Sequence, residues 1–144
     1  MFAQSAISLA LVALTGFAAA IPVDSVAMGS KHTVYLATST RFSAVAYYAN
    51  GPVSSSQGPT AITTSTVHAW EGTKSARIGT AAFSSTINAG ADALPEGQIA
   101  GSAKLGTEDL VCFSDGATTF GGEEDLGLTT WTCTADYWCP SIAA

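Results

Sequence analysis

The segment QIAGSAKL, residues 98–105, alternates with a period of two residues. Because successive side chains of a β-strand point to opposite faces, this period is typical of an extended segment. We predict a strand over 98–105. Its two faces would carry Ile99, Gly101, Ala103 and Leu105 on one side, and Gln98, Ala100, Ser102 and Lys104 on the other.

Similar segments lie on both sides of this one. They are rich in Thr, Val, Ile, Tyr and Phe, and Gly, Pro and Asn separate them at short intervals, which favours strands and turns. Segment 42–49 is apolar on both faces, as a central strand would be. The predicted strands are 32–38, 42–49, 60–70, 74–78, 81–87, 98–105, 108–114 and 129–134.

No segment after residue 20 keeps a helical period for more than about two turns, which argues against helical bundles and α/β folds. Residues 90–97 are predicted to form a loop with one helical turn. The sequence therefore predicts an all-β fold, a small antiparallel β-sandwich or barrel of roughly seven or eight strands.

Residues 1–20 form an apolar segment that ends in Ala18-Ala19-Ala20, small residues of the kind that a signal peptidase accepts. Its apolar run of about 14 residues is shorter than the roughly 20 that span a bilayer, so a cleaved leader is favoured over an anchor. We predict a secreted, extracellular protein with a secretory signal peptide (1–20), an N-terminal arm (21–31) and a single β-rich domain (32–144).

The net charge of −6 is distributed unevenly along the chain. Residues 21–91 carry +2, whereas residues 92–144 hold nine acids against Lys104 and carry −8. An acidic surface repels phosphate, so neither nucleic acid nor an anionic membrane is expected as a partner.

The disulfide candidates are Cys112, Cys133 and Cys139. In an oxidising compartment two should pair and one should remain. Loop-closure entropy gives about 3.4, 3.6 and 2.4 kcal/mol for 112–133, 112–139 and 133–139, too close to choose between them. The positions favour a bridge that includes Cys112. The third thiol is then buried and inert, a reactive nucleophile, or a crosslink that turns a monomer into a disulfide-linked dimer.

No catalytic, cofactor-binding or metal-binding residue can be assigned. The sequence lacks a Gly-x-Ser-x-Gly nucleophile elbow. With only His32 and His68 and no Cys-x-x-Cys, a zinc site is not expected. The best cation candidate is Asp115-Gly116 with Glu123-Glu124-Asp125, but its spacing does not match an EF-hand, and we interpret 115–125 as a solvated acidic loop.

Two neighbouring aromatic residues are candidates for surface contact. Tyr137 and Trp138 must point to opposite sides of an extended chain, so one of them should be partly exposed. Trp131 alternates with Cys133 and should face the core.

Several short runs give the chain its likeness to a known class. They are Ile21-Pro22-Val23, Val34-Tyr35-Leu36, Ala46-Tyr47-Tyr48 and the closing Asp136-Tyr137-Trp138-Cys139-Pro140. Together with the leader, they resemble small secreted fungal proteins of the effector-like class. Members of that class are mostly uncharacterised, so the resemblance transfers no functional residue. Many carry an even number of cysteines, from which this chain departs.

These observations predict a secreted, non-enzymatic binding protein without a cofactor, whose partner is an extracellular protein or carbohydrate. Two alternatives stay open. One is a small hydrolase in which Glu71, Glu108 and Asp109 converge as the carboxylates of a glycosidase do. The other is a cell-wall protein attached through the Ser/Thr-rich segment 54–66.

We expect the expressed protein in the culture medium, with Ile21 as its first residue. Separation of medium, wall and cells, followed by N-terminal sequencing, measures this directly. Protein retained in the cells with its leader intact would contradict the prediction, and a wall-bound product would favour the cell-wall alternative.

Overall fold

The computed structural model describes residues 32–53, 58–124 and 129–142. The predicted signal peptide (1–20), the arm (21–31), Asp125 and part of the Ser/Thr-rich segment lie outside the described residues. Within the described part, no helix is long and apolar enough to cross a membrane. The helical turn predicted within 90–97 is present as the 3-10 helix η1, Ala91–Ala93.

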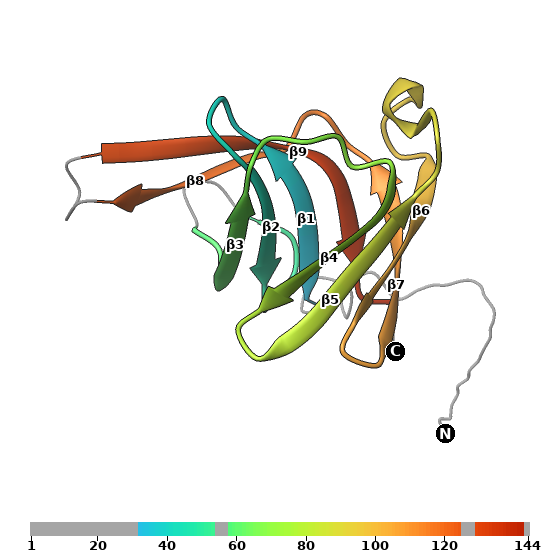
Figure 1. Cartoon of the computed structure of the whole chain (residues 1–144), viewed down its shortest axis with the longest axis horizontal. Coiled ribbons are helices and arrows are strands. Elements are labelled where there is room, and N and C mark those ends of the chain that lie inside the picture. Colours follow the sequence, from blue (N-terminus) through green and yellow to red (C-terminus); the bar gives the residue numbers. More distant parts are fainter. Residues whose placement is uncertain (1–31, 54–57, 125–128, 143–144) are drawn as a thin grey trace. The chain divides into compact units, whose positions relative to one another are not determined.

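The described ranges form nine strands, which pair antiparallel throughout. They follow the order β3-β2-β1-β9-β7-β6-β5-β4, with β8 attached to β9 beside this path (Figure 1). The strands are β1 Thr33–Thr38, β2 Ser43–Tyr48, β3 Ala61–Ser65, β4 Gly72–Ile78, β5 Ala81–Ile87, β6 Ile99–Leu105, β7 Glu108–Ser114, β8 Thr119–Glu124 and β9 Thr129–Pro140.

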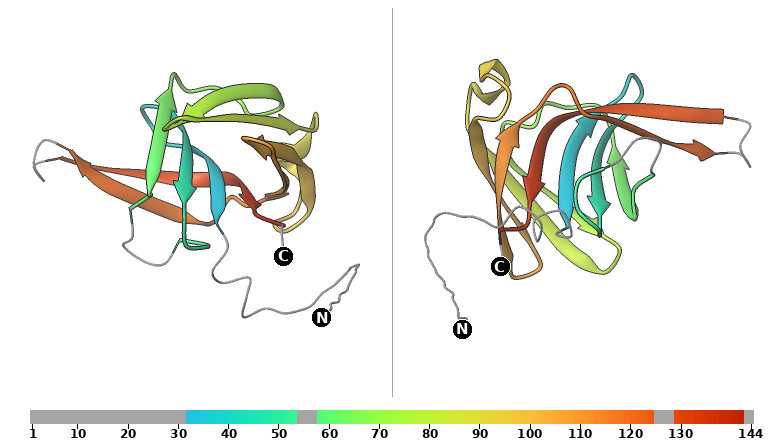
Figure 2. Two further views of the ribbon diagram at one scale, coloured as in Figure 1. Left: turned by 90° about the horizontal axis from the view of Figure 1, so that it is seen from below. Right: turned by 180° about the vertical axis from the view of Figure 1, so that it is seen from behind.

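The sheet curls until its two terminal strands, β3 and β4, approach each other (Figure 2). The Thr63 hydroxyl on β3 donates a hydrogen bond to the Arg77 carbonyl oxygen on β4. Among the described pairings no ladder joins these strands, so the sheet is nearly closed into a barrel. The all-β antiparallel prediction is confirmed, and a barrel-like closure is the form it takes.

Two hydrophobic layers stabilise this sheet, one inside the barrel and one on its outer side. The interior cluster includes Leu36, Val45, Phe83, Ile87, Leu110 and Tyr137. The outer cluster includes Tyr35, Ala46, Tyr48, Phe120, Cys133 and Ala135. Strands β1 and β2 contribute to both, which confirms the interpretation of 42–49 as a central strand.

Strand β9 passes from the outer cluster to the interior through a β-bulge at Asp136. Opposite β1, Tyr137 pairs with Leu36 and Ala135 pairs with Ala37, which leaves Asp136 without a partner in that ladder. An extra residue of this kind shifts the two-residue alternation by one. Ala135 therefore faces outward and Tyr137 faces inward, although they are two residues apart.

The same shift determines which cysteines can meet. Cys133 precedes the bulge and lies in the outer cluster, whereas Cys139 follows it and lies in the interior with Cys112. Cys112 and Cys139, with Cα atoms 4.1 Å apart, form a disulfide between β7 and β9. The favoured bridge through Cys112 is thus confirmed. Cys133 is free and buried, and burial raises the pKa of its thiol to about 11.

The prediction of a solvated loop over 115–125 is wrong for Thr119–Glu124, which forms β8 along β9. Phe120 anchors this strand in the outer cluster. Gly121 and Gly122 allow the close approach, because a Cβ would lie 2.3 Å from the Trp131 carbonyl oxygen or 2.6 Å from its ring. Glycine is depleted in strands, so these two residues conceal the strand pattern in the sequence.

The predicted faces of 98–105 are wrong at one end. The β6–β7 register shifts between Ile99 and Gly101, and this irregularity leaves Ile99 63% exposed and Ala100 fully buried. Gly101 lies against β5, where a Cβ would be 2.1 Å from the Thr86 carbonyl oxygen. Two other strands were predicted with wrong bounds. Of the predicted strand 60–70, only Ala61–Ser65 is a strand. The predicted strand 129–134 continues to Pro140 as β9.

Replacing Cys112 and Cys139 together with alanine should lower the free energy of unfolding by about 3–4 kcal/mol, because the bridge closes a long loop in the unfolded chain. Urea unfolding measures this change. The matched control is Cys133→Ala, which leaves the bridge in place.

In the unaltered monomer we expect one reactive thiol, and only after denaturation, because Cys133 is buried. Titration with a thiol reagent before and after denaturation tests this. Rapid reaction of the native protein, or no thiol after denaturation, would contradict the assignment.

Candidate functional site

A cavity of about 300 Å³ opens at one end of the barrel, and we call it the mouth cavity. Here β1 and β7 end, β4 begins, and the segment from β3 to β4 crosses the barrel (Figure 1). The side chains that define its chemistry are Trp70, Glu71, Asp92, Asp115, Asp136 and Tyr137.

The crossing segment, residues 66–71, is held in place by hydrogen bonds to Ser43 on β2. Ser43 accepts a hydrogen bond from the backbone N–H of His68 at 3.0 Å, and its hydroxyl lies 3.3 Å from the carbonyl oxygen of the same residue. The His68 ring packs edge-on against Trp70, with centroids 4.5 Å apart. These contacts fix the wall of the mouth cavity that the crossing segment supplies.

Two aromatic residues of the interior cluster, Trp70 and Tyr137, line the mouth cavity. Trp70 is 4% exposed and Tyr137 is 2% exposed, so little of either ring is open to the cavity. Both belong to the same cluster as Phe83 and Leu110, whose side chains fill the barrel.

Four carboxylates from different parts of the chain line the mouth cavity, and none of its lining residues is Lys or Arg. Glu71 precedes β4, Asp92 lies on η1, Asp115 follows β7 and Asp136 is the bulge residue of β9. The Asp115 carboxylate accepts backbone N–H bonds from Ala117 and Thr118, each 2.9 Å, which fix its turn. Carboxylates gathered in a concave site focus a negative potential there.

The environment of the Asp136 carboxyl changes its pKa. Partial burial raises its pKa above the usual value, and the nearby charges of Asp115 and Glu71 raise it further. The Thr38 hydroxyl donates to it at 2.6 Å and partly offsets the shift by stabilising the charged form. The same cause, burial first, raises the pKa of Tyr137 to about 12, with Glu71 as the leading charged neighbour.

The Trp70 indole N–H is buried and interacts with the Asp136 carboxyl as a hydrogen-bond donor, which lowers the pKa of that group by stabilising its charged form. The Trp70 and Thr38 donors thus oppose the larger, raising effect of burial on the pKa of Asp136.

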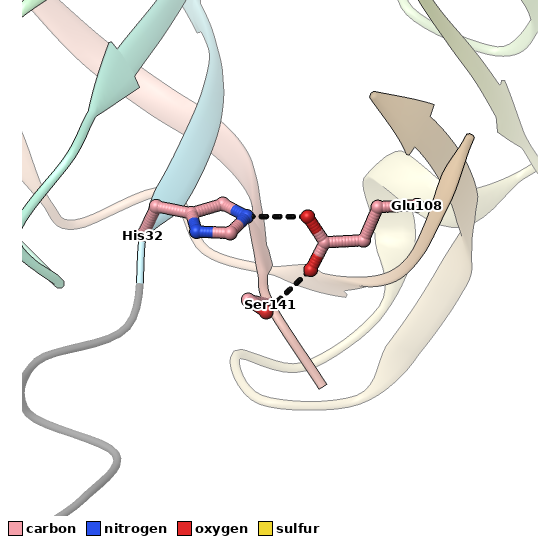
Figure 3. Close-up of polar contacts among 3 residues, drawn as sticks. All are labelled: His32, Glu108 and Ser141. Atoms are coloured by element: carbon pink, nitrogen blue, oxygen red, sulfur yellow. Dashed lines mark hydrogen bonds and ion pairs between the residues drawn. The ribbon is translucent and has the colours of Figure 1, made fainter. Parts of the chain in front are cut away.

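The opposite end of the barrel carries a second polar cluster (Figure 3). Glu108 accepts from the Ser141 hydroxyl at 2.5 Å and lies 2.7 Å from His32 Nε2. The carboxylate thus stands between hydroxyl and imidazole, whereas a Ser-His-acid triad places the imidazole in the middle. Because the Ser141 backbone N–H also donates to the His32 carbonyl oxygen, we interpret this cluster as a clamp on the strand ends.

The proposed hydrolase carboxylates do not converge. Glu71 lines the mouth cavity, whereas Glu108 belongs to the clamp at the other end of β7, about 20 Å along the strand from Ser114. Asp109 is exposed and pairs with Lys104 at 2.8 Å. Among the described residues, no group of three His, Cys, Asp or Glu side chains is arranged to hold a metal ion.

The predicted contact pair separates onto two faces. Tyr137 is buried in the lining of the mouth cavity, while Trp138 packs against the outer cluster, its ring 5.3 Å from that of Phe113. Trp131 packs against the same outer cluster, on its rim. Sequence reasoning missed Asp92 and Asp136 as site residues, because no fixed spacing relates them to each other or to the other acids.

Comparison of the chain with protein-family models, with curated proteins and with solved structures found no match. The chemistry of the mouth cavity is therefore derived from its own residues.

Asp136→Asn should stabilise the protein at pH 7. The folded protein holds the Asp136 proton more tightly than the unfolded chain does, so its ionisation costs stability as pH rises from about 4 through the folded-state pKa. Asparagine cannot ionise and can still accept from Thr38. Urea midpoints should show a gain at neutral pH that disappears near pH 3.

Asp109→Asn is the matched control, because that carboxylate is exposed and far from the mouth cavity. A gain of equal size at both pH values, or a loss for Asp136→Asn at neutral pH, would contradict the expected linkage.

Proposed function

We propose that this chain is a secreted, non-enzymatic binding protein, effector-like in role, that takes its ligand in the mouth cavity. The observation that carries this proposal is a cavity whose lining combines four carboxylates with Trp70 and Tyr137 and contains neither Lys nor Arg. Ligand sites typically combine an apolar or aromatic surface with a few convergent polar groups in a concavity.

Two features support the extracellular part of the proposal. The apolar segment 1–20 has the composition of a secretory leader. The Cys112–Cys139 disulfide is compatible with an oxidising compartment.

Features of the described surface favour the mouth cavity over other places. The barrel interior is filled by its hydrophobic cluster. Trp138 is partly exposed, as expected for one of the two neighbouring aromatic residues, and packs against the outer cluster. At the other end, the Glu108 carboxylate is engaged by His32 and by the Ser141 hydroxyl. Only the mouth cavity combines volume, aromatic surface and unneutralised charge among the sites described above.

A hydrolase is the second candidate, and one observation favours it. Asp136, Glu71 and Asp115 line one cavity, and partial burial raises the pKa of Asp136, as it does for the general acid of glycosidases. Such an enzyme would convert a bound saccharide to products, whereas a binding protein would release it unchanged.

A thermal-shift panel of glucose, N-acetylglucosamine, glucosamine, 1,4-diaminobutane and dilysine tests the proposed function. At least one should raise the melting temperature of the mature protein, because a ligand that binds only the folded state stabilises it. Ala69→Trp, which fills the mouth cavity, should abolish that shift, and Ala82→Trp on the exposed start of β5 should keep it.

An equal shift in both tryptophan variants would place the ligand elsewhere, and no shift with any probe would count against a small-molecule site. Chromatography of the saccharides after incubation distinguishes the two candidates, because new products would support the hydrolase.

A further inference from the structure

We infer that a cationic protein partner docks with apolar side chains on the outer face of β6, β7 and β9. The surface is a row of three side chains, Ile99, Phe113 and Trp138, one from each strand, and we call it the apolar row. This inference goes beyond the proposed function and does not depend on the mouth cavity.

The apolar row follows from the register of three neighbouring strands (Figure 1). Ile99 is paired with Phe113, and Phe113 is paired with Trp138. Because paired residues of adjacent strands point to the same face, the three side chains lie side by side. The rings of Phe113 and Trp138 have centroids 5.3 Å apart. The next pairing, of Trp138 with Tyr35, carries the row into the buried outer cluster.

The other end of the apolar row is open to solvent. Ile99 is 63% exposed, the largest fraction among the large hydrophobic side chains of the described residues, and Phe113 and Trp138 are partly exposed. The register shift after Ile99 turns this side chain outward and places Ala100 inside. Burial of apolar surface favours the opposite choice, because isoleucine gains more from it than alanine. Irregularities of this kind often direct a side chain for a function.

The side chains of the apolar row suit a protein better than a saccharide. Ile99 and Phe113 have no side-chain group that can bond to a sugar hydroxyl. The core of a protein–protein interface is enriched in aromatic residues and depleted of charge. Val111 lies two residues before Phe113 on the same face of β7 and is half-buried, so it extends the apolar surface along the strand.

Acidic residues border the apolar row. Glu96 is exposed in the turn before β6. The Gly97 N–H donates to the Ser114 carbonyl oxygen at 2.9 Å, which holds this turn beside the end of β7. Asp115 follows Phe113 by two residues. A partner with basic residues around its apolar side chains would therefore match this surface in charge.

The charge of the surrounding chain favours the same partner. Residues 92–144 contain one basic residue, Lys104, which lies 2.8 Å from the carboxylate of Asp109. A second copy of this chain carries the same net charge of −6, so electrostatic repulsion opposes self-association through the apolar row.

Three heptapeptides, LKLKLKL, LELELEL and SKSKSKS, test the inference at low salt. We expect LKLKLKL to bind the mature protein at least tenfold more tightly than the other two, because only this peptide combines apolar side chains with positive charge. Titration calorimetry measures the affinities. LKLKLKL should also move the indole N–H signal of Trp138 in a heteronuclear NMR spectrum and leave that of Trp70, in the mouth cavity, in place.

Ile99→Ser should reduce the affinity for LKLKLKL about tenfold, because an anchor at the open end of the row is lost. The variant is expected to fold, since Ile99 is largely exposed. Val67→Ser is the matched control, because Val67 is also an exposed hydrophobic residue but lies outside the apolar row. Ala69→Trp, which fills the mouth cavity, should bind LKLKLKL like the unaltered protein.

Failure of LKLKLKL to bind, binding equal to that of either other peptide, or binding unaffected by Ile99→Ser would overturn the inference. Loss of binding in Ala69→Trp would also overturn it, by placing the peptide in the mouth cavity, and would leave the proposed function intact.

Two further measurements address other occupants of the apolar row. Sedimentation of the unaltered protein would assign the row to a second copy if it revealed a dimer that Ile99→Ser dissociates. An N-acetylglucosamine hexamer that binds the unaltered protein and not Ile99→Ser would assign the row to a carbohydrate. Either result would overturn the cationic protein partner.

Discussion

The β-bulge at Asp136 is the constraint on which the rest of the structure depends. It lets one strand, β9, pair with β8 in its first half and with β1 and β7 in its second half. Because the bulge changes the side on which alternate residues lie, Cys133 reaches the outer cluster and Cys139 reaches the interior. Without this change of side, β9 could not join the two hydrophobic layers, and Cys139 would face away from Cys112.

The same bulge places a carboxyl at the mouth cavity, partly buried and near other acids. The backbone around Asp136 is used by the turn after β7, since Asp115 N–H donates to its carbonyl oxygen and Gly116 N–H donates to that of Ala135. The side chain, in contrast, is partly buried near two other acids and has a raised pKa. Bulges often direct a side chain into a functional site, and perturbed carboxyls often mark one. Ionisation of Asp136 thus lowers the stability of the fold, and the same side chain lines the mouth cavity.

The sequence predicted the strands well where alternation was regular and poorly where it was interrupted. Segments 32–38 and 81–87 became β1 and β5 almost unchanged, because their apolar periods are continuous. The sequence did not predict that Ile99 is exposed and Ala100 buried. Alanine is small enough to fit either face of a strand, so the pattern gave no sign of the register shift. Strand β8 was missed because its two glycines carry no side-chain pattern, although the close packing on Trp131 requires them.

The site was harder to predict than the fold for a geometric reason. Glu71, Asp92, Asp115 and Asp136 are separated by about twenty residues each, and only the meander of the sheet returns the chain to the same end of the barrel. No short sequence motif therefore predicts that these four acids line the same cavity. The disulfide could be predicted only in part. The sequence favoured a bridge through Cys112, but the choice of Cys139 over Cys133 as its partner depends on the bulge.

The two ends of the barrel now contrast in a way that composition alone would not reveal. At the end with the clamp, the Glu108 carboxylate accepts from the Ser141 hydroxyl and contacts His32. At the mouth cavity, four carboxylates belong to a lining that contains neither Lys nor Arg. Carboxylates in a concave site give it a negative potential. This difference in charge between the two ends is therefore the main reason to place the proposed function at the mouth cavity.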